Sequence, residues 1–290
     1  MLLRNPFFAS VIPMIHRVEL YDECIVEMKV MNEEYSMRFG GLGRLYGVDA
    51  MTRLANAHVC ICGIGGVGSW VVEALARSGV GAITLIDMDD ICVTNTNRQL
   101  HTLVDTVGLQ KGDVMAQRVR LINPDCRVES ISDFILADTL DELISSKFDI
   151  VVDAIDDLGN KCLLAAHCHK LDIPLVMIGG AGGRRDPTQI HAKELTNTTH
   201  DGLLRKVRRR LKYDHGYRGK SWTISCVYSS ELPVYPMTDG SVNTTPEFNS
   251  TLALDCYSGF GTATFVTGSF GFTASAVVVD LLLNQETKQE

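Results

Sequence analysis

Gly63-Ile-Gly-Gly-Val-Gly-Ser69 is the most informative stretch of this 290-residue chain. It lies between a short apolar run, His58 to Cys62, and an amphipathic segment that begins near Ser69. Glycines let a backbone turn tightly and approach a ligand closely, and a helix N-terminus behind the turn presents unpaired N–H groups and the positive end of a dipole. The sequence therefore predicts a phosphate-binding turn that uses Gly63, Gly65, Gly66 and Gly68.

Strand-like segments alternate with helix-like segments from Leu54 to Gly180, which is typical of a parallel sheet covered on both faces. The expected strands are His58–Cys62, Ala82–Ile86, Arg127–Ile131, Asp149–Ala154 and Pro174–Ile178. The expected helices lie near Ser69–Ser78, Lys111–Ile122, Leu140–Ser145 and Leu158–Leu171. We predict an α/β fold with a doubly wound, Rossmann-like and mostly parallel sheet.

The pattern changes beyond Gly183, where we expect a strand and loop extension with strands at Thr188–Ala192 and Trp222–Tyr228. The apolar stretch from Gly259 to Leu283 contains a single charge, but its glycines make the first half a poor helix. Its second half alone is too short to span a membrane. We therefore expect a buried C-terminal helix and no stable membrane association.

The domain boundaries follow from these patterns. Residues 1–35 are expected to be a poorly ordered extension, residues 36–285 a single domain, and residues 286–290 a tail. Within the domain, residues 36–185 form the nucleotide-binding core and residues 186–285 the substrate and dimer region.

Nine cysteines without any Cys-x-x-Cys pair argue against a zinc ribbon. Their odd number without a secretory signal favours reduced thiols and a cytoplasmic location.

A dense polar cluster follows the apolar run Ala82–Ile86. Asp87 ends that run, at about the spacing where an acidic residue meets a nucleotide ribose. A nicotinamide site needs an apolar slot for a neutral ring, whereas a triphosphate site needs fixed donors and cations. The cluster favours a triphosphate, and its other members are Asp89, Asp90, Thr94, Asn95, Asn97, Arg98, Gln99 and His101.

Two members of this cluster and two later polar residues have a clear chemical use beside phosphate. Arg98 can make paired hydrogen bonds to phosphate, and Asn95 can donate from its amide without adding charge. Lys111 supplies a point charge at the start of the next predicted helix. Asp156 follows a predicted strand at the edge where open α/β folds bind ligands, and a carboxylate beside phosphates is a natural magnesium ligand.

The set of motifs resembles the adenylating enzymes related to ubiquitin activation, which include the bacterial activators of sulfur-carrier proteins. The motifs that carry the resemblance are Gly63–Ser69, Asp87–Gln99, Lys111 and Asp153–Asp156. The resemblance implies the same α/β fold and a reaction in which a carboxylate attacks the α-phosphorus of ATP. The products of that step are an acyl-adenylate and pyrophosphate.

The resemblance also implies roles for single residues. Asp87 holds the ribose, Asn95, Arg98 and Lys111 hold the phosphates, and Asp156 holds magnesium. Carboxylate and triphosphate are both anions, so bringing them together requires neutralised charge and donors fixed in advance. The cations at Arg98 and Lys111, with magnesium at Asp156, meet that requirement.

Three further motifs are similar to the branch of this family that modifies tRNA. They are Arg38–Gly47, Gly179–Gly183 with Asp186–Ile190, and Asp255–Gly261. The similarity covers roughly residues 36–285. It implies that the carboxylate of a threonylcarbamoyl group, on the adenosine beside the anticodon, is activated and then cyclised with net loss of water.

A basic segment between Leu203 and Lys220 fits a tRNA partner, in a protein whose formal net charge is -8. Phosphate contacts from such a segment make affinity depend on salt, and a neighbouring aromatic side chain can stack on a splayed base. A solvated helix face is the alternative explanation. The candidate tRNA-binding residues are Arg205, Lys206, Arg208, Arg209, Arg210 and Lys212.

The family's architecture implies a homodimer, because an arginine of the N-terminal motif reaches the ATP of the partner subunit. The matching position here is Gly41, so Arg44 is the candidate for that catalytic role and Arg38 is the alternative. Related enzymes use a cysteine to take the acyl group as a thioester. Cys226 and Cys256 are the candidates for such a thiol, and a buried structural thiol is the other interpretation of both.

Two other functions remain open at this point. One is adenylation of the C-terminus of a ubiquitin-like or sulfur-carrier protein, which would use an acidic, apolar-lined groove in place of a basic surface. The other is a nucleotide-binding scaffold that works with sulfur-relay proteins.

Overall fold

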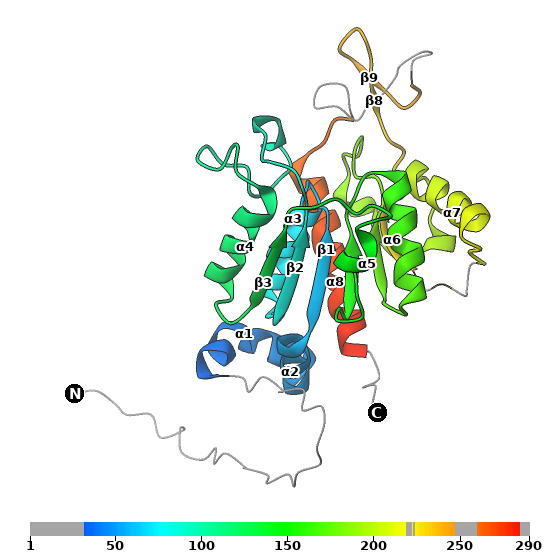
Figure 1. Cartoon of the computed structure of the whole chain (residues 1–290). Helices are drawn as coiled ribbons and strands as arrows, with labels where there is room; N and C mark the ends of the chain where they lie inside the picture. The colour runs from blue at the N-terminus through cyan, green and yellow to red at the C-terminus, as the bar shows by residue number, and fades with distance from the viewer. Residues whose placement is uncertain (1–31, 219–221, 223, 247–259, 285–290) are drawn as a thin grey trace.

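A seven-stranded sheet forms the centre of the protein, with the strand order β3-β2-β1-β4-β5-β7-β6 (Figure 1). The computed structural model describes residues 32–218, 222, 224–246 and 260–284. Paired strands run parallel except β6, which is antiparallel to β7. The predicted mostly parallel α/β sheet is confirmed. The strands are β1 His58–Cys62, β2 Ala82–Ile86, β3 Arg127–Ile131, β4 Ile150–Asp153, β5 Leu175–Ile178, β6 Ile190–Glu194 and β7 Ile224–Ser229.

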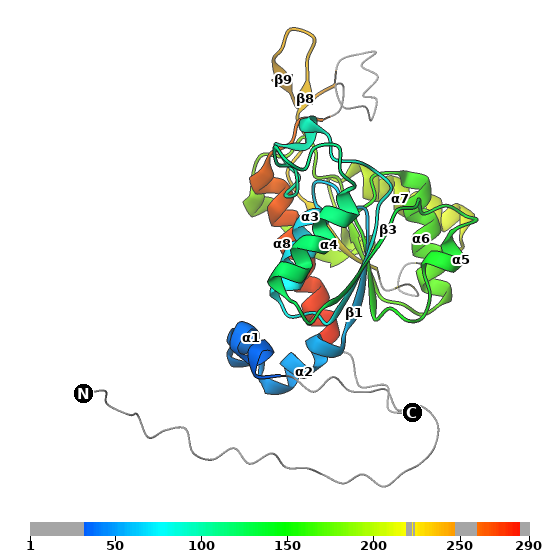
Figure 2. The same ribbon diagram turned by 60° about the vertical axis from the view of Figure 1, so that its left-hand side comes forward.

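Helices cover both faces of this sheet (Figures 1 and 2). One face carries α3 Gly68–Arg77, α4 Lys111–Ile122 and α8 Thr264–Asn284. The other face carries α5 Leu140–Leu143, α6 Leu158–Lys170 and α7 Gly202–Asp214. A small hairpin, β8 Tyr235–Pro236 and β9 Val242–Asn243, projects beyond the sheet, and three short 3-10 turns span Val93–Asn95, Pro187–Gln189 and Leu195–Asn197.

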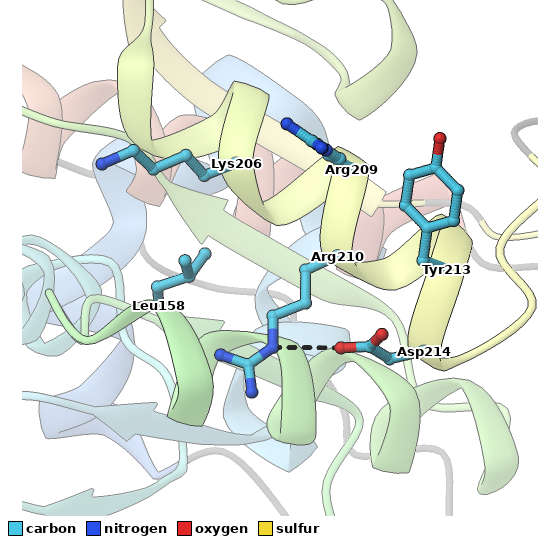
Figure 3. Close-up of a pocket in the computed structure, with 6 residues that line it drawn as sticks. All are labelled: Leu158, Lys206, Arg209, Arg210, Tyr213 and Asp214. Carbon is cyan, nitrogen blue, oxygen red and sulfur yellow. Dashed lines mark hydrogen bonds and ion pairs between the residues drawn. The ribbon is translucent and has the colours of Figure 1, made fainter.

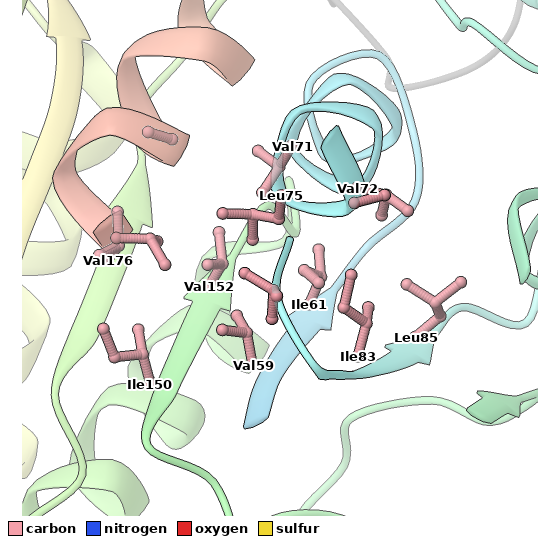
Figure 4. Packing of buried hydrophobic residues seen from close by; sticks show 14 of the residues in the cluster. Val59, Ile61, Val71, Val72, Leu75, Ile83, Leu85, Ile150, Val152 and Val176 are labelled. Carbon is pink, nitrogen blue, oxygen red and sulfur yellow. The ribbon is translucent and has the colours of Figure 1, made fainter. Parts of the chain in front are cut away.

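Alternation along the strands supplies one apolar layer to each face. Val59 and Ile61 of β1 pack beneath Val71 and Leu75 of α3 (Figure 4), whereas the residues between them face the other side. This period of two is the geometry of an extended strand buried on both faces. Packing on both faces holds the parallel strands in place. The loops that follow their carboxyl ends are therefore held at one edge of the sheet.

Two helices precede the first strand, α1 Glu33–Tyr46 and α2 Val48–Asn56, at the end of the sheet where the strands begin (Figure 1). Asn32 caps α1 by accepting a 2.6 Å hydrogen bond from the Tyr35 amide, and the Tyr35 hydroxyl donates to the Gly79 carbonyl at 2.7 Å. The chain is thus helical from Glu33, inside the range 1–35 expected to be an extension. Residues 1–31 and the tail 286–290 lie outside the described residues.

Helix α8 begins earlier than expected, at Thr264, and includes Gly268 and Gly271, two of the glycines that argued against a helix. A Cβ atom on Gly271 would lie 2.5 Å from the Cβ of Trp70, so this glycine lets α8 pack closely on α3. By length and composition α8 could cross a membrane, but 56% of its most apolar window is buried within the protein. The predicted buried C-terminal helix is confirmed.

Replacing Gly271 with alanine is expected to lower the free energy of unfolding by roughly 1–3 kcal/mol, because the added methyl group forces α8 away from α3. Urea denaturation measures the change. Gly202→Ala is the matched control, since no heavy atom lies within 4 Å of the Cβ position there. Equal stability of the two variants would contradict the close packing of α8 on α3.

Candidate active site

The glycine turn lies between β1 and α3. Two of its glycines lie so close to other backbone atoms that no side chain fits at their positions. Gly63 has φ 89°, and a Cβ there would lie 2.9 Å from the Ala154 carbonyl after β4. A Cβ on Gly68 would lie 1.8 Å from the Gly63 oxygen. Neither position accepts a side chain, so these two glycines shape the turn and set it against the end of β4.

Gly65 and Gly66 have a different environment, because only side chains lie near them. The nearest atom to a Cβ on Gly65 would be Nε2 of Gln99, at 3.8 Å, and a Cβ on Gly66 would lie 3.3 Å from the methylenes of Arg98. The structure therefore brings Arg98 over the turn. A phosphate on this surface would meet the backbone of the turn and the Arg98 side chain together.

Asp87, directly after β2, is hydrogen-bonded to the glycine turn. Its carboxylate accepts hydrogen bonds from the Ile64 amide at 2.5 Å and from the Asp89 amide at 2.9 Å. Burial raises the pKa of Asp87, and the nearby Lys111 ammonium opposes that rise. The carboxylate thus lies beside the glycines, where the ribose of a nucleotide on the turn would be.

Lys111 and Asn95 are held at the same edge by their own partners. The Lys111 ammonium lies 2.6 Å from the Asp89 carboxylate and 4.0 Å from that of Asp87, and its side chain is only 7% exposed. The Asn95 side-chain oxygen accepts from the Cys92 amide at 2.9 Å. That bond fixes the orientation of the Asn95 carboxamide, with its NH₂ group as the remaining donor.

Arg98 is positioned through its backbone as well as its side chain. Its carbonyl accepts from the Trp70 indole of α3 at 3.0 Å and from the Thr267 hydroxyl of α8 at 3.3 Å. Its guanidinium donates to the Thr94 carbonyl at 2.8 Å. Two helices far apart in sequence therefore fix the residue expected to meet phosphate.

Asp156 lies exposed in the loop between β4 and α6, two positions after Ala154, which contacts Gly63. Within the described part of the chain, no group of three His, Cys, Asp or Glu side chains comes together to hold a metal ion. Magnesium needs only one or two carboxylates when substrate phosphates and water complete its shell. Asp156 therefore suits a magnesium ion that arrives with a nucleotide.

Gln99 and His101, two members of the polar cluster without a predicted role, form a buried pair. The Gln99 side-chain oxygen lies 3.0 Å from Nε2 of His101. Burial lowers the pKa of His101 to about 4, so the imidazole is neutral at physiological pH and can donate from Nε2. This bond orients the Gln99 amide group towards Gly65. The short spacing of the two residues after Arg98 was the only signal in the sequence.

His101→Gln should remove part of the acid sensitivity of the fold. A histidine whose pKa is lower in the folded protein binds fewer protons there than in the unfolded chain. The free energy of unfolding therefore decreases as the pH falls from about 6.5 towards 4. Between pH 7 and pH 5 this loss is about 2 kcal/mol. Urea titrations of both proteins at these pH values measure it, and an identical acid loss in the variant would contradict the neutral imidazole.

Residues 41–288 match the ThiF family. The chain belongs to the ThiF family. The resemblance inferred from the glycine turn and the polar cluster is therefore confirmed.

Among ThiF relatives, the tRNA threonylcarbamoyladenosine dehydratase of Escherichia coli is 49% identical over an alignment of 267 positions, which covers 90% of this chain and 98% of that protein. The enzyme of the same name from Haemophilus influenzae is 46% identical and covers 88% of this chain and 97% of its own. A crystal structure of the Escherichia coli enzyme in complex with ATP has a TM-score of 0.79 at 46% identity, and covers 90% of this chain and 100% of that one.

Arg44 is the predicted ThiF site residue that the fold does not bring to the nucleotide edge. It lies in α1, at the opposite end of the sheet from the glycine turn (Figure 1). Arg38, the alternative, lies on the same helix and forms an ion pair with Glu34 at 2.5 Å. An action of either arginine on a nucleotide would therefore have to reach the site of another subunit.

Most of the basic segment lies in α7. The predicted tRNA-binding residues on this helix differ in their exposure to solvent. Arg205, Lys206, Arg209 and Lys212 are exposed. Arg208 is only partly exposed, and its guanidinium is bonded within the protein because it donates to the Leu195 carbonyl at 3.0 Å. A groove of about 290 Å³ separates α7 from the start of α6 (Figure 3), and it is lined by Leu158, Lys206, Arg209, Arg210, Tyr213 and Asp214.

The two candidate thiols have different outcomes. Cys226 is fully buried in β7, and burial raises the pKa of its thiol well above the usual range, which disfavours the thiolate. The structure thus supports the buried interpretation for Cys226. Cys256, with most of the motif Asp255–Gly261, lies outside the described residues, as does Lys220 at the end of the basic segment.

Proposed function

We propose that this protein dehydrates threonylcarbamoyladenosine beside the tRNA anticodon in an ATP-dependent reaction in the cytoplasm. One observation carries the proposal. The glycine turn, Arg98 and Lys111 lie together at one edge of the sheet, and Asp156 follows β4 at that edge, in a chain about half identical to dehydratases that it covers almost end to end. ATP is the expected cosubstrate, because a relative was crystallised with it.

The first chemical step joins two anions. The substrate carboxylate attacks the α-phosphorus of ATP, the bond to pyrophosphate breaks, and an acyl-adenylate forms. Arg98 and Lys111 neutralise the phosphates, and the turn supplies backbone N–H groups, so that the donors are in place before charge develops. Asp87 holds the ribose and Asn95 donates to phosphate without adding charge.

The second step is intramolecular. A nucleophile of the same threonylcarbamoyl group displaces AMP, which carries away one carboxylate oxygen. The nucleoside therefore loses one water overall, and no carrier protein is consumed. Because no acyl group has to be handed to a thiol, the burial of Cys226 is compatible with this chemistry.

Magnesium is expected at Asp156, where it would offset the charge of the leaving pyrophosphate. A homodimer is expected as well, because Arg44 lies at the opposite end of its own subunit and could serve only a partner's nucleotide. Sulfur-relay partners stay a prediction from the family resemblance.

Replacing Arg205, Arg209 and Lys212 with alanine should weaken tRNA binding. The negative slope of log affinity against log salt should become less steep by roughly two to three, because up to three phosphate contacts are lost. ATP affinity should not change. Arg120, Arg127 and Lys147, three exposed cations around β3, provide a charge-matched control. Filter binding over a salt series measures the slope, and equal slopes for the two triple variants would contradict a role for α7.

Pyrophosphate release tests the reaction class. With ATP, magnesium and tRNA that contains threonylcarbamoyladenosine, the protein should release pyrophosphate and AMP above the level with unmodified tRNA. Release stimulated by a sulfur-carrier protein instead would support carrier activation. No release with either partner would contradict both enzymatic functions and favour the scaffold.

A further inference from the structure

We infer that the groove between α6 and α7 binds one unstacked base of single-stranded RNA, next to the modified adenosine. The inference rests on the proposed function, because it names the part of the RNA substrate that the basic face of α7 receives. It goes beyond a general attraction to phosphate by assigning a base-stacking position and a place along the strand.

The base-stacking position is Tyr213, at the end of the groove where α7 finishes (Figure 3). Its side chain is 74% exposed, and the Arg209 guanidinium lies 6.0 Å from the ring centroid. An exposed ring beside a cation is a poor core residue, but it offers a flat surface on which any base can stack. Paired bases inside a duplex cannot reach such a surface.

The phosphate positions are Lys206 and Arg210, on the side of the groove that faces α6. Arg210 donates from Nε to the Asp214 carboxylate at 3.2 Å, and its Nη1 lies 3.5 Å from where a Cβ on Gly159 would be. This ion pair orients the guanidinium across the first turn of α6 (Figure 3). Three cations against a single carboxylate give the lining a positive balance, which fits an RNA backbone.

The groove also lies close to the proposed reaction centre. Leu158, which lines it, starts α6 only two positions after Asp156. The approach of Arg210 to Gly159, and the Cys162 thiol 4.0 Å from the Val207 carbonyl, place α7 against the N-terminal half of α6. A strand held in the groove therefore passes the carboxyl edge of the sheet, and its bound base belongs to a near neighbour of the modified adenosine.

Binding of an anticodon stem-loop RNA to Tyr213 variants tests the inference. Tyr213→Leu should raise the Kd about tenfold, whereas Tyr213→Phe should bind nearly as the wild type does, since stacking needs the ring and not the hydroxyl. Because the side chain is so exposed, neither change should disturb the fold. A blunt RNA duplex of equal charge is the control, and its affinity should be the same for all three proteins.

Two outcomes would overturn the assignment: wild-type affinity of Tyr213→Leu for the stem-loop, or an equal loss for stem-loop and duplex. The assay needs neither ATP nor turnover, so failure of the proposed reaction is a separate result. In the active enzyme, Tyr213→Leu should raise KM for tRNA by a similar factor and leave kcat at saturating tRNA and KM for ATP unchanged.

Discussion

Asp156→Ala should lower magnesium-dependent pyrophosphate release by at least roughly 10²-fold while the protein stays folded. The expected loss is large because this exposed carboxylate is the proposed protein ligand of the ion that offsets the charge of pyrophosphate. Its exposure also means that truncation leaves no cavity, so stability should remain close to that of the wild type.

The measurement is pyrophosphate release with modified tRNA over a series of magnesium concentrations, with a thermal melt for each protein. Asp138→Ala is the matched control, because Asp138 is also an exposed aspartate but follows β3 instead of β4. Wild-type turnover by the Asp156 variant, or an equal loss in the control, would remove Asp156 from the reaction.

Lys161→Met is expected to lower the free energy of unfolding by about 3–5 kcal/mol, because it breaks a fully buried ion pair. The Lys161 ammonium lies 2.9 Å from the Asp153 carboxylate, and both side chains are 0% exposed. Burial raises the pKa of Asp153, and Lys161 is the cation that opposes this rise. Without Lys161, the carboxyl group must be buried as an unpaired charge or take up a proton.

Urea denaturation of the single variant and of the double variant Asp153→Leu with Lys161→Met tests the ion pair. The double variant should recover part of the lost stability, because it buries no unpaired charge. The single variant should also lose less at acidic pH, where its Asp153 is protonated. A double variant less stable than Lys161→Met would contradict the electrostatic explanation.

The parts of the fold that could be predicted depend on local patterns. Alternating and continuous apolar runs located β1 to β5 to within a residue or two, and Gly63 and Gly68 marked the turn because its backbone admits no side chain. Arg98 and Lys111 were predicted to bind phosphate from their charge and their positions after β2. The structure places Arg98 over the glycine turn and Lys111 beside Asp87.

The parts that could not be predicted depend on tertiary contacts. Helix propensity argued against a helix through Gly271, whereas the close approach of Trp70 explains the glycine. Arg208 and Arg209 are adjacent in a charge run, and only the phase of α7 shows that one is tied to Leu195 while the other is exposed. The pairing of Gln99 with His101 likewise becomes visible only when the chain is folded.

Mass analysis of tRNA nucleosides, before and after incubation with the protein, ATP and magnesium, tests the proposed function most directly. Threonylcarbamoyladenosine should lose the mass of one water only when ATP is present, and AMP and pyrophosphate should appear with the product. An unchanged nucleoside mass while the folded protein binds both ATP and the modified tRNA would contradict it.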